Sequence, residues 1–179
     1  TARRTRQYPI EFGHSSSYVE TTHHPVIEQL GRRLLSAMDY SGLVEVEFKY
    51  DRRNGRYKLL DVNPRVWTWH TLCAAAGVDF PYLLWQFLNG EAPRDLRGRH
   101  GVRWVRMSTD LVAALSLLAK GHLSIRDYID SLRPPLHLST FALDDPLPSL
   151  LGAPMASASR IKRFLGSGSD SRTKRCQPP

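Results

Sequence analysis

Residues 43–65 read LVEVEFKYDRRNGRYKLLDVNPR and contain two β-forming stretches separated by turn residues. The first stretch, 43–50, alternates apolar and polar side chains, which is the pattern of a strand with one buried face. Residues 51–55 have turn chemistry, and 56–63 return as a second strand that Pro64 ends. We therefore expect an antiparallel hairpin within an α+β fold, in which helices pack on an antiparallel β-sheet.

The face on which each polar side chain of the hairpin lies depends on the register. Regular alternation along the second strand puts four side chains on one face: Tyr57, Leu59, Asp61 and Asn63. Directly opposed residues point to the same side of a sheet, and an odd-numbered loop centred on Asn54 places Glu47 opposite Asp61. The same loop places Glu45 opposite Asn63. The polar side chains of both strands, Glu45, Glu47, Asp61 and Asn63, would then converge on one face. A two-residue turn instead splits them across two faces, and the sequence leaves both registers open.

A metal site is the first functional hypothesis for this hairpin, with Glu47, Asp61 and Asn63 as its oxygen ligands. Converging carboxylates repel each other unless a cation lies among them, and hard oxygen ligands suit Mg²⁺ or Mn²⁺. Because Mg²⁺ keeps part of its shell for phosphate oxygens, such a site suits ATP, and Arg65 adds a positive fork for phosphate. The alternative is that the acids only form the solvated face of a strand.

The elements on either side of the hairpin are predicted from periodicity, caps and turn residues. Thr22 is expected to cap a helix that has Pro25 in its first turn and apolar residues at helical spacing as far as Met38. Before this helix, 8–20 mix β-formers with a glycine–serine loop at 13–17. The remaining predictions are helices at 66–76, 80–89, 109–119, 124–132 and 149–165, a strand at 101–107, a proline-rich loop at 141–149 and a disordered basic tail at 166–179.

The net charge of +8 over 179 residues is concentrated at the two ends of the chain. Residues 1–10 contribute +3 and 160–179 contribute +5, so that 11–159 are neutral overall. This distribution disfavours a nucleic-acid-binding domain, although a polyanion-binding protein with two basic ends stays an alternative. With 41% hydrophobic and 23% charged residues, the composition is that of an ordinary globular domain.

The sequence also predicts where the chain is found. The longest apolar run, 111–119, is much shorter than the ~20 residues that cross a bilayer, so we expect a soluble chain that does not span a membrane. Because the sequence opens at Thr1 without Met or a signal-peptide pattern, we expect a fragment or a processed chain. Two cysteines, Cys73 and Cys176, suggest neither a disulfide framework nor a metal site, which fits a reducing cytoplasm. Cys73 precedes three alanines and is expected to be a small buried hydrophobe.

Residues 61–65, DVNPR, together with Glu47 and the basic turn between them, resemble the end of an ATP-grasp domain. This is the domain found in carbamoyl phosphate synthetase, biotin carboxylase and the carboxylate–amine ligases. In that family, an acid on one strand and an acidic-x-Asn-Pro-Arg tract on the next hold the metals that bridge the phosphates of ATP. The resemblance implies that Glu47, Asp61 and Asn63 are metal ligands and that Arg65 contacts the transferred phosphoryl group. The family usually has Glu where this chain has Asp61.

The resemblance covers about residues 1–90, which correspond to the carboxyl-terminal lobe, and leaves a helical extension at 91–165 and a tail at 166–179. It implies an ATP-dependent ligase that activates a carboxylate as an acyl phosphate and joins it to an amine, with Mg²⁺-ATP. The family's adenine pocket and phosphate-gripping lysines lie upstream, so this part alone is expected to be inactive. A non-catalytic nucleotide-binding or scaffolding module is the alternative. The residues expected to border the substrates are His14, Ser15, Ser16, Trp67 and His70.

Overall fold

The computed structural model describes residues 1–92, 94–141 and 144–149 of the chain. The chain divides into two compact units, Thr1–Ser139 and Thr140–Pro179. The strands and helices described below all lie in the first unit. Among the described residues, no helix combines the length and apolar character needed to cross a membrane. The helix predicted for 149–165 and the tail predicted for 166–179 lie almost wholly outside the described residues.

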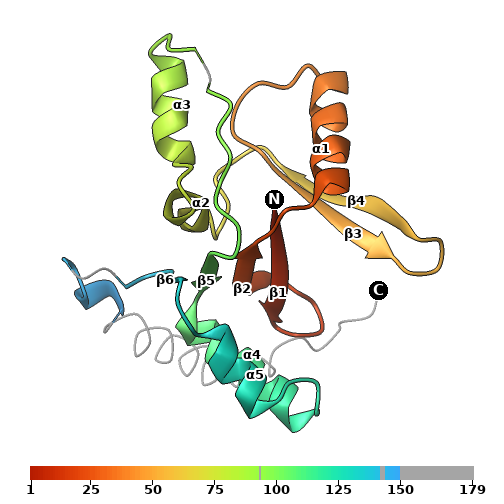
Figure 1. The fold of residues 1–179 in the computed structure, drawn as a ribbon, viewed down its shortest axis with the longest axis vertical. Helices are drawn as coiled ribbons and strands as arrows, with labels where there is room; N and C mark the ends of the chain where they lie inside the picture. Colours follow the sequence, from red (N-terminus) through yellow and green to blue (C-terminus); the bar gives the residue numbers. More distant parts are fainter. Residues whose placement is uncertain (93, 142–143, 150–179) are drawn as a thin grey trace, which may run out of the picture. The chain divides into compact units, whose positions relative to one another are not determined.

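A four-stranded sheet with the strand order β1-β2-β5-β6 is the larger of the two sheets (Figure 1). Its strands are β1 (Ala2–Tyr8), β2 (Ser15–Thr21), β5 (Arg103–Val105) and β6 (Leu136–Leu138). Neighbouring strands are antiparallel except for β6, which pairs with β5 in parallel. The mixture of helices and mostly antiparallel strands confirms the predicted α+β class. The sequence did not predict β6, because a strand of 3 residues has no detectable periodicity.

Helices in the described residues are α1 (Pro25–Ala37), α2 (Thr71–Ala75), α3 (Phe80–Leu88), α4 (Met107–Ala119) and α5 (Ile125–Ser131). The N-cap of α1 is His24, whose Nδ1 accepts a hydrogen bond from Ile27 N at 3.5 Å, so the predicted cap at Thr22 was wrong. Thr22 lies too far before the helix and hydrogen-bonds with Thr1 instead. α2 is shorter than the predicted 66–76 because the preceding residues form turns.

β3 (Glu45–Asp51) and β4 (Arg56–Asn63) form the predicted antiparallel hairpin, which is a separate sheet beside α1 (Figure 1). Neither of the two loops that the sequence left open forms, because Asp51 pairs with Arg56 and the four residues 52–55 separate them. Gly55 closes the turn with φ of 67°, and its N–H donates to Asp51 O at 2.9 Å. This left-handed conformation suits glycine, which has no Cβ to strain it.

A β-bulge at Leu60 changes the register between the turn and the far end of the hairpin. Phe48 pairs with Leu59, whereas Glu47 pairs with Asp61, so that Leu60 is an extra residue on β4. The extra residue reverses the alternation of side chains from that point onward. The prediction that Leu59 and Asp61 share one face was therefore wrong.

The core of the first unit lies where β2, β5 and α2 meet. Its buried members are Val19, Leu72, Ala76, Val102 and Trp104. Trp104 is fully buried, and its indole N–H donates to Thr71 Oγ1 at 3.0 Å, which satisfies a donor that burial would otherwise leave unpaired. Because α2 follows the hairpin closely in sequence, this core anchors the end of the hairpin beside the larger sheet.

A buried ion pair joins β1 to α4. Arg6 Nε and Nη2 each donate to a carboxylate oxygen of Asp110 at 2.8 Å, and the Asp110 side chain is fully buried. Ser17 Oγ donates to the same carboxylate at 3.0 Å, and the Arg6 guanidinium lies 4.0 Å from the centre of the Tyr18 ring. Buried charges are tolerated when they are paired and hydrogen-bonded in this way. The contact fixes the first strand against the helical layer.

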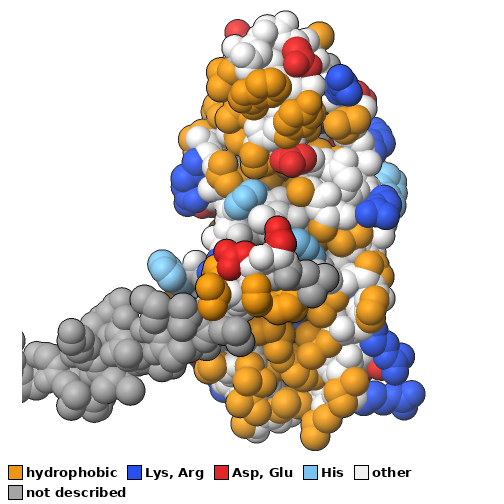
Figure 2. Space-filling model, turned by 90° about the vertical axis from the view of Figure 1, so that its left-hand side faces the viewer, with side chains coloured by type: hydrophobic (Ala, Val, Ile, Leu, Met, Phe, Trp, Pro, Cys, Tyr) orange, Lys and Arg blue, Asp and Glu red, His pale blue; other side chains and the backbone are white. Residues whose placement is uncertain are grey.

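Hydrophobic side chains gather on the surface of α4 and α5, in the lower part of the view in Figure 2. Met107, Leu111 and Leu115 follow one face of α4 at intervals of four, and Ile125 and Ile129 do the same on α5. These side chains are between 42% and 69% exposed. Together they form an apolar stripe on the helical side of the first unit.

Candidate functional site

The far end of the hairpin brings four polar side chains together, as one of the two predicted registers required. Glu47 lies opposite Asp61, and Glu45 lies opposite Asn63. Asn63 Nδ2 donates to Asp61 Oδ2 at 2.9 Å and to Glu45 Oε2 at 3.4 Å. Because opposed residues point to the same side of the sheet, the carboxylates converge on one face.

The opposite face of the hairpin carries its apolar pairs and packs toward α1. Phe48 lies opposite Leu59, and Tyr50 lies opposite Tyr57. The Tyr57 hydroxyl is 2.7 Å from His24 Nε2, at the start of α1. The acids lie on the opposite face of the hairpin, where Glu47 is 3.3 Å from Arg4 of the larger sheet.

The electrostatics of the acids favour a positive charge among them. Burial raises the pKa of Glu45 to about 7, and the neighbouring Glu47 carboxylate adds to the increase. Arg4, Asn63 and Arg65 lower the same pKa but do not cancel the increase. A carboxyl group with this pKa is only partly ionised near neutral pH, since nearby negative charge and burial both disfavour its ionised form. A cation among these oxygens would restore the ionised form.

The donor set fits a hard divalent cation that shares its coordination shell with phosphate. Glu47, Asp61 and Asn63 offer carboxylate and amide oxygens, which are the ligands that Mg²⁺ and Mn²⁺ prefer. Within the described residues, no three His, Cys, Asp or Glu side chains form a metal-binding group by themselves. Mg²⁺ is usually bound through one or two carboxylates together with phosphate oxygens.

Two arginines border the acids: Arg65, which follows β4, and Arg4, which lies on β1. Arg65 Nη2 donates to Asn63 Oδ1 at 3.1 Å, and Arg65 Nη1 donates to Val66 O at 3.4 Å. Arg4, on β1, has its Nη2 3.3 Å from Glu47 Oε2. The sequence predicted Arg65 but missed Arg4, because nothing in the local sequence separates Arg4 from the other arginines of the first strand. Its approach to the hairpin depends on how the two sheets meet.

These side chains line one hollow of about 370 Å³, a size typical of small-ligand sites. The acids and both arginines share its wall with four of the predicted substrate residues: His14, Ser15, Ser16 and Trp67. His70 is not among the lining residues, and its Nδ1 lies 2.8 Å from Trp67 O. The hollow thus joins the predicted metal and phosphate residues to residues 13–16. The loop predicted for 13–17 was wrong beyond His14, because Ser15 begins β2.

Three further wall residues, Phe12, Leu60 and Thr68, were not predicted from the sequence. Leu60 reaches the wall because it is the extra residue of the bulge, and only the pairing register could have revealed it. Trp67 is 6% exposed, and its indole N–H has no hydrogen-bond partner among the described residues. A buried donor without a partner costs free energy, so Trp67 is a candidate for contact with a bound molecule.

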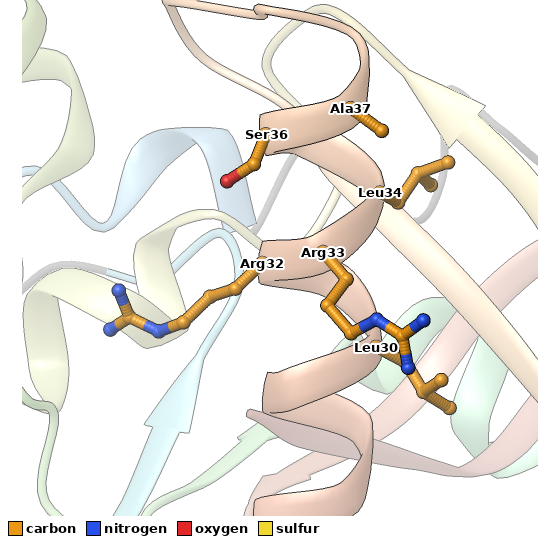
Figure 3. Close-up of a pocket in the computed structure, with 6 residues that line it drawn as sticks. All are labelled: Leu30, Arg32, Arg33, Leu34, Ser36 and Ala37. Carbon is orange, nitrogen blue, oxygen red and sulfur yellow. The ribbon is translucent and has the colours of Figure 1, made fainter.

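A larger hollow, of about 620 Å³, lies along α1 (Figure 3). Its lining residues all come from that helix: Leu30, Arg32, Arg33, Leu34, Ser36 and Ala37. In the close-up, Arg32 and Arg33 point to different sides of the helix, and Arg32 Nε donates to Glu28 Oε1 at 3.2 Å. Because binding sites need polar groups that converge, we assign the functional site to the smaller hollow.

Comparison with known proteins identifies the family. The family described as ATP-grasp in the biosynthetic pathway with Ter operon matches residues 2–109, which include all the residues that line the candidate site. The chain belongs to this ATP-grasp family, as the resemblance of residues 61–65 predicted. Membership places it in a superfamily of ATP-binding, ATP-dependent ligases. No curated protein and no solved structure matches the chain.

Proposed function

We propose that this chain is the phosphate- and metal-binding part of an ATP-dependent carboxylate–amine ligase. One observation carries the proposal. In a chain of the ATP-grasp family, the residues of the acidic hairpin end and Arg65 line the same hollow as residues 13–16. Metal ligands, a cation for phosphate and a wall for substrate are the parts that transfer of a phosphoryl group to a carboxylate requires.

Each residue at the hairpin end has a proposed role. Glu47, Asp61 and Asn63 would hold Mg²⁺, or Mn²⁺ in its place, through their side-chain oxygens. When bound, this cation offsets the negative charge between the β- and γ-phosphates of ATP. Arg65 would bind the equatorial oxygens of the transferred phosphoryl group, which makes it the catalytic residue of this part.

The proposed reaction has two steps. An oxygen of the substrate carboxylate forms a bond to the γ-phosphorus of ATP, and the bond from that phosphorus to the bridging oxygen breaks, which releases ADP. The amine then attacks the carbonyl carbon of the acyl phosphate and loses a proton, and inorganic phosphate leaves. His14, Ser15 and Ser16 are proposed to border the acid, with Trp67 and His70 on the amine side. These residues act by positioning and electrostatics.

In the family, the adenine pocket and the phosphate-gripping lysines come before the segment that this chain resembles. We therefore propose that these residues work together with an upstream ATP-grasp half and do not turn over ATP alone. The small-molecule acid, the amine and ATP are the proposed partners. A reducing cytoplasm is the proposed location, in line with the two cysteines.

A non-catalytic ATP-grasp-like module that scaffolds a partner is the second candidate. The apolar stripe on α4 and α5 favours it, since contiguous exposed apolar side chains often mark interaction surfaces. Such a module would bind Mn²⁺-ATP but would not release ADP in response to an acid and an amine.

ADP release by the full-length protein separates the two candidates. The ligase proposal predicts ADP only when ATP, a carboxylate and an amine are all present. Glu47→Gln, which keeps the shape of the side chain and removes its charge, should lower kcat by about 100-fold. Asp51→Asn, at the turn end of the same strand and outside the hollow, is the matched control and should stay within about twofold. Wild-type ADP release in the Glu47 variant would refute the proposal.

A further inference from the structure

Arg4 extends from the four-stranded sheet to the acidic end of the hairpin. Its Nη2 lies 3.3 Å from Glu47 Oε2, and its Nη1 donates to Gly13 O at 3.4 Å. The side chain is 30% exposed and lines the hollow. Within the part of the chain that the structure describes, these contacts leave most N–H donors of the guanidinium unused. Arg4 therefore has donors to offer to a molecule in the hollow.

A bulge in β1 is what directs Arg4 toward the hairpin. Arg4 pairs with Val19 and Arg6 pairs with Tyr18, so that Thr5 is an extra residue between them. Because Val19 and Tyr18 are neighbours in β2 and point to opposite faces, Arg4 and Arg6 also point to opposite faces. Arg6 turns to the buried ion pair with α4, and Arg4 turns to the hollow. In a regular strand, both arginines would lie on one face.

Glu47 has two positive partners in the proposed enzyme. Its carboxylate pairs with Arg4 in this structure, and it is also a proposed ligand of the divalent cation. A carboxylate that is shared with a divalent cation stabilises the guanidinium less, and a partly buried arginine without an anion is costly. The ATP-loaded site therefore favours a further anion beside Arg4.

The location of Arg4 favours the carboxylate of the substrate as this anion. Arg65 adjoins the proposed metal ligand Asn63 and so serves the phosphate side of the hollow. Arg4 instead contacts Gly13, which directly precedes the proposed acid-binding wall of the hollow, residues 14–16. A guanidinium fork matches the planar geometry of a carboxylate, and the N–H donors that Gly13 and Glu47 leave unused can donate to one.

We propose that Arg4 binds the carboxylate of the acid substrate on the loop side of the hollow. The inference rests on the proposed ligase function and adds to it a residue that selects the acid. Each of the two arginines then binds one of the two anionic groups of the reaction. Arg65 takes the transferred phosphoryl group, and Arg4 holds the carboxylate that receives it.

The experiment uses the full-length protein and three variants. Arg4→Met removes the charge and keeps the length of the side chain, whereas Arg4→Lys keeps the charge and removes the fork. Arg3→Met is the matched control, because the Arg3 side chain is 68% exposed and lies 3.7 Å from Glu20, outside the hollow. Wild-type ADP release is first screened with ATP, hydroxylamine as the amine, and a panel of the standard amino acids and short dicarboxylic acids. The most active acid is then used to measure its KM, the KM for Mg²⁺-ATP, and its Kd without ATP by calorimetry.

The inference predicts that Arg4→Met raises both the KM and the ATP-free Kd of the acid by about 10- to 100-fold, as expected for a lost charged hydrogen bond. The KM for Mg²⁺-ATP should stay within about threefold, Arg4→Lys should recover part of the affinity, and Arg3→Met should match wild type. An unchanged KM and Kd for the acid, or an effect confined to Mg²⁺-ATP, would overturn the inference and leave Arg4 as a partner of Glu47 only. A wild-type protein that releases no ADP with any acid of the panel would remove the proposed function and the inference together.

Discussion

Asn63 shows how a single amide organises the charges of the site. Its Nδ2 donates to Asp61 and Glu45, while its Oδ1 accepts from Arg65 at 3.1 Å. A carboxylate in this position would keep the contact with Arg65 but would lose the two donated hydrogen bonds. The sequence pattern predicted Asn63 as a metal ligand, and that role stays a prediction. The sequence pattern could not show that the Asn63 amide also hydrogen-bonds to both Asp61 and Glu45, because these contacts depend on side-chain geometry.

Asn63→Asp should destabilise the protein in the absence of metal. The new carboxylate would lie beside Asp61 and opposite Glu45, and the added repulsion should cost about 1 kcal/mol of unfolding free energy. Thermal unfolding in EDTA should show the loss, and saturating Mn²⁺ with ATP should recover most of it, because the cation offsets the added charge. An equal loss of Tm under both conditions would argue against a cation site here.

Cys73 should behave as an unreactive thiol. Burial raises the pKa of Cys73 to about 12, and Glu45 contributes a smaller increase. At pH 8 the thiolate fraction then falls from about a quarter for an ordinary thiol to about one part in ten thousand. In a Cys176→Ser background, iodoacetamide should alkylate the folded protein on the order of 1000-fold more slowly than the urea-unfolded protein. Similar rates in the two states would contradict this account of Cys73.

Among the elements, the hairpin shows what a sequence pattern can and cannot predict. Alternation and turn residues were enough to predict both strands. The even-numbered turn alone would put Glu47 opposite Leu60, and the bulge restores the pairing of Glu47 with Asp61. The pairing of Glu47 with Asp61, which one of the two open registers required, therefore forms through a bulge and not through an odd-numbered loop. Adjacent leucines at 59 and 60 fit a regular strand and a bulge equally well, so the sequence cannot distinguish the two.

Two length changes in the hairpin test this interpretation. Deleting Leu60 removes the bulge but leaves Leu59 and Asp61 on the faces they already occupy, so affinity for Mn²⁺-ATP should change by less than about threefold. Inserting an alanine between Glu47 and Phe48 gives Leu60 a partner and turns the acids toward α1, so affinity should fall at least about tenfold. Calorimetry on the full-length protein measures both. Equal losses in the two variants would show that the bulge does not set the faces.

The link between β1 and α4 should be important for stability. Arg6→Met leaves the Asp110 carboxylate buried without its partner, which should cost about 3–5 kcal/mol of unfolding free energy. The double variant Arg6→Met/Asp110→Leu should recover part of this loss, because it removes both charges. Arg3→Met, at an exposed position of the same strand, should cost less than about 1 kcal/mol. Urea unfolding provides the comparison, and a single variant as stable as Arg3→Met would contradict the assignment.

For the molecule as a whole, the sequence predicted the family and most helices, and missed the features that depend on distant contacts. The tract at 61–65 was sufficient to predict the family, because its combination of residue types is specific. Arg4 joined the site only once two sheets and a bulge in β1 were in place. The charge of +8 at the chain ends did not help to locate the site, which lies in the family-matched segment 2–109. A polyanion-binding role for the basic ends stays a prediction.

Whether the hairpin end binds the cation is tested by titrating the full-length protein with Mn²⁺ in the presence of ATP and recording electron paramagnetic resonance spectra. We expect Glu47→Gln combined with Asp61→Asn to weaken Mn²⁺ binding by about 100-fold, because the site loses both of its charged ligands. Asp51→Asn, on the same hairpin but outside the hollow, should bind Mn²⁺ as wild type does. Wild-type Mn²⁺ affinity in the double variant would contradict the claim that the hairpin end holds the cation of Mg²⁺-ATP.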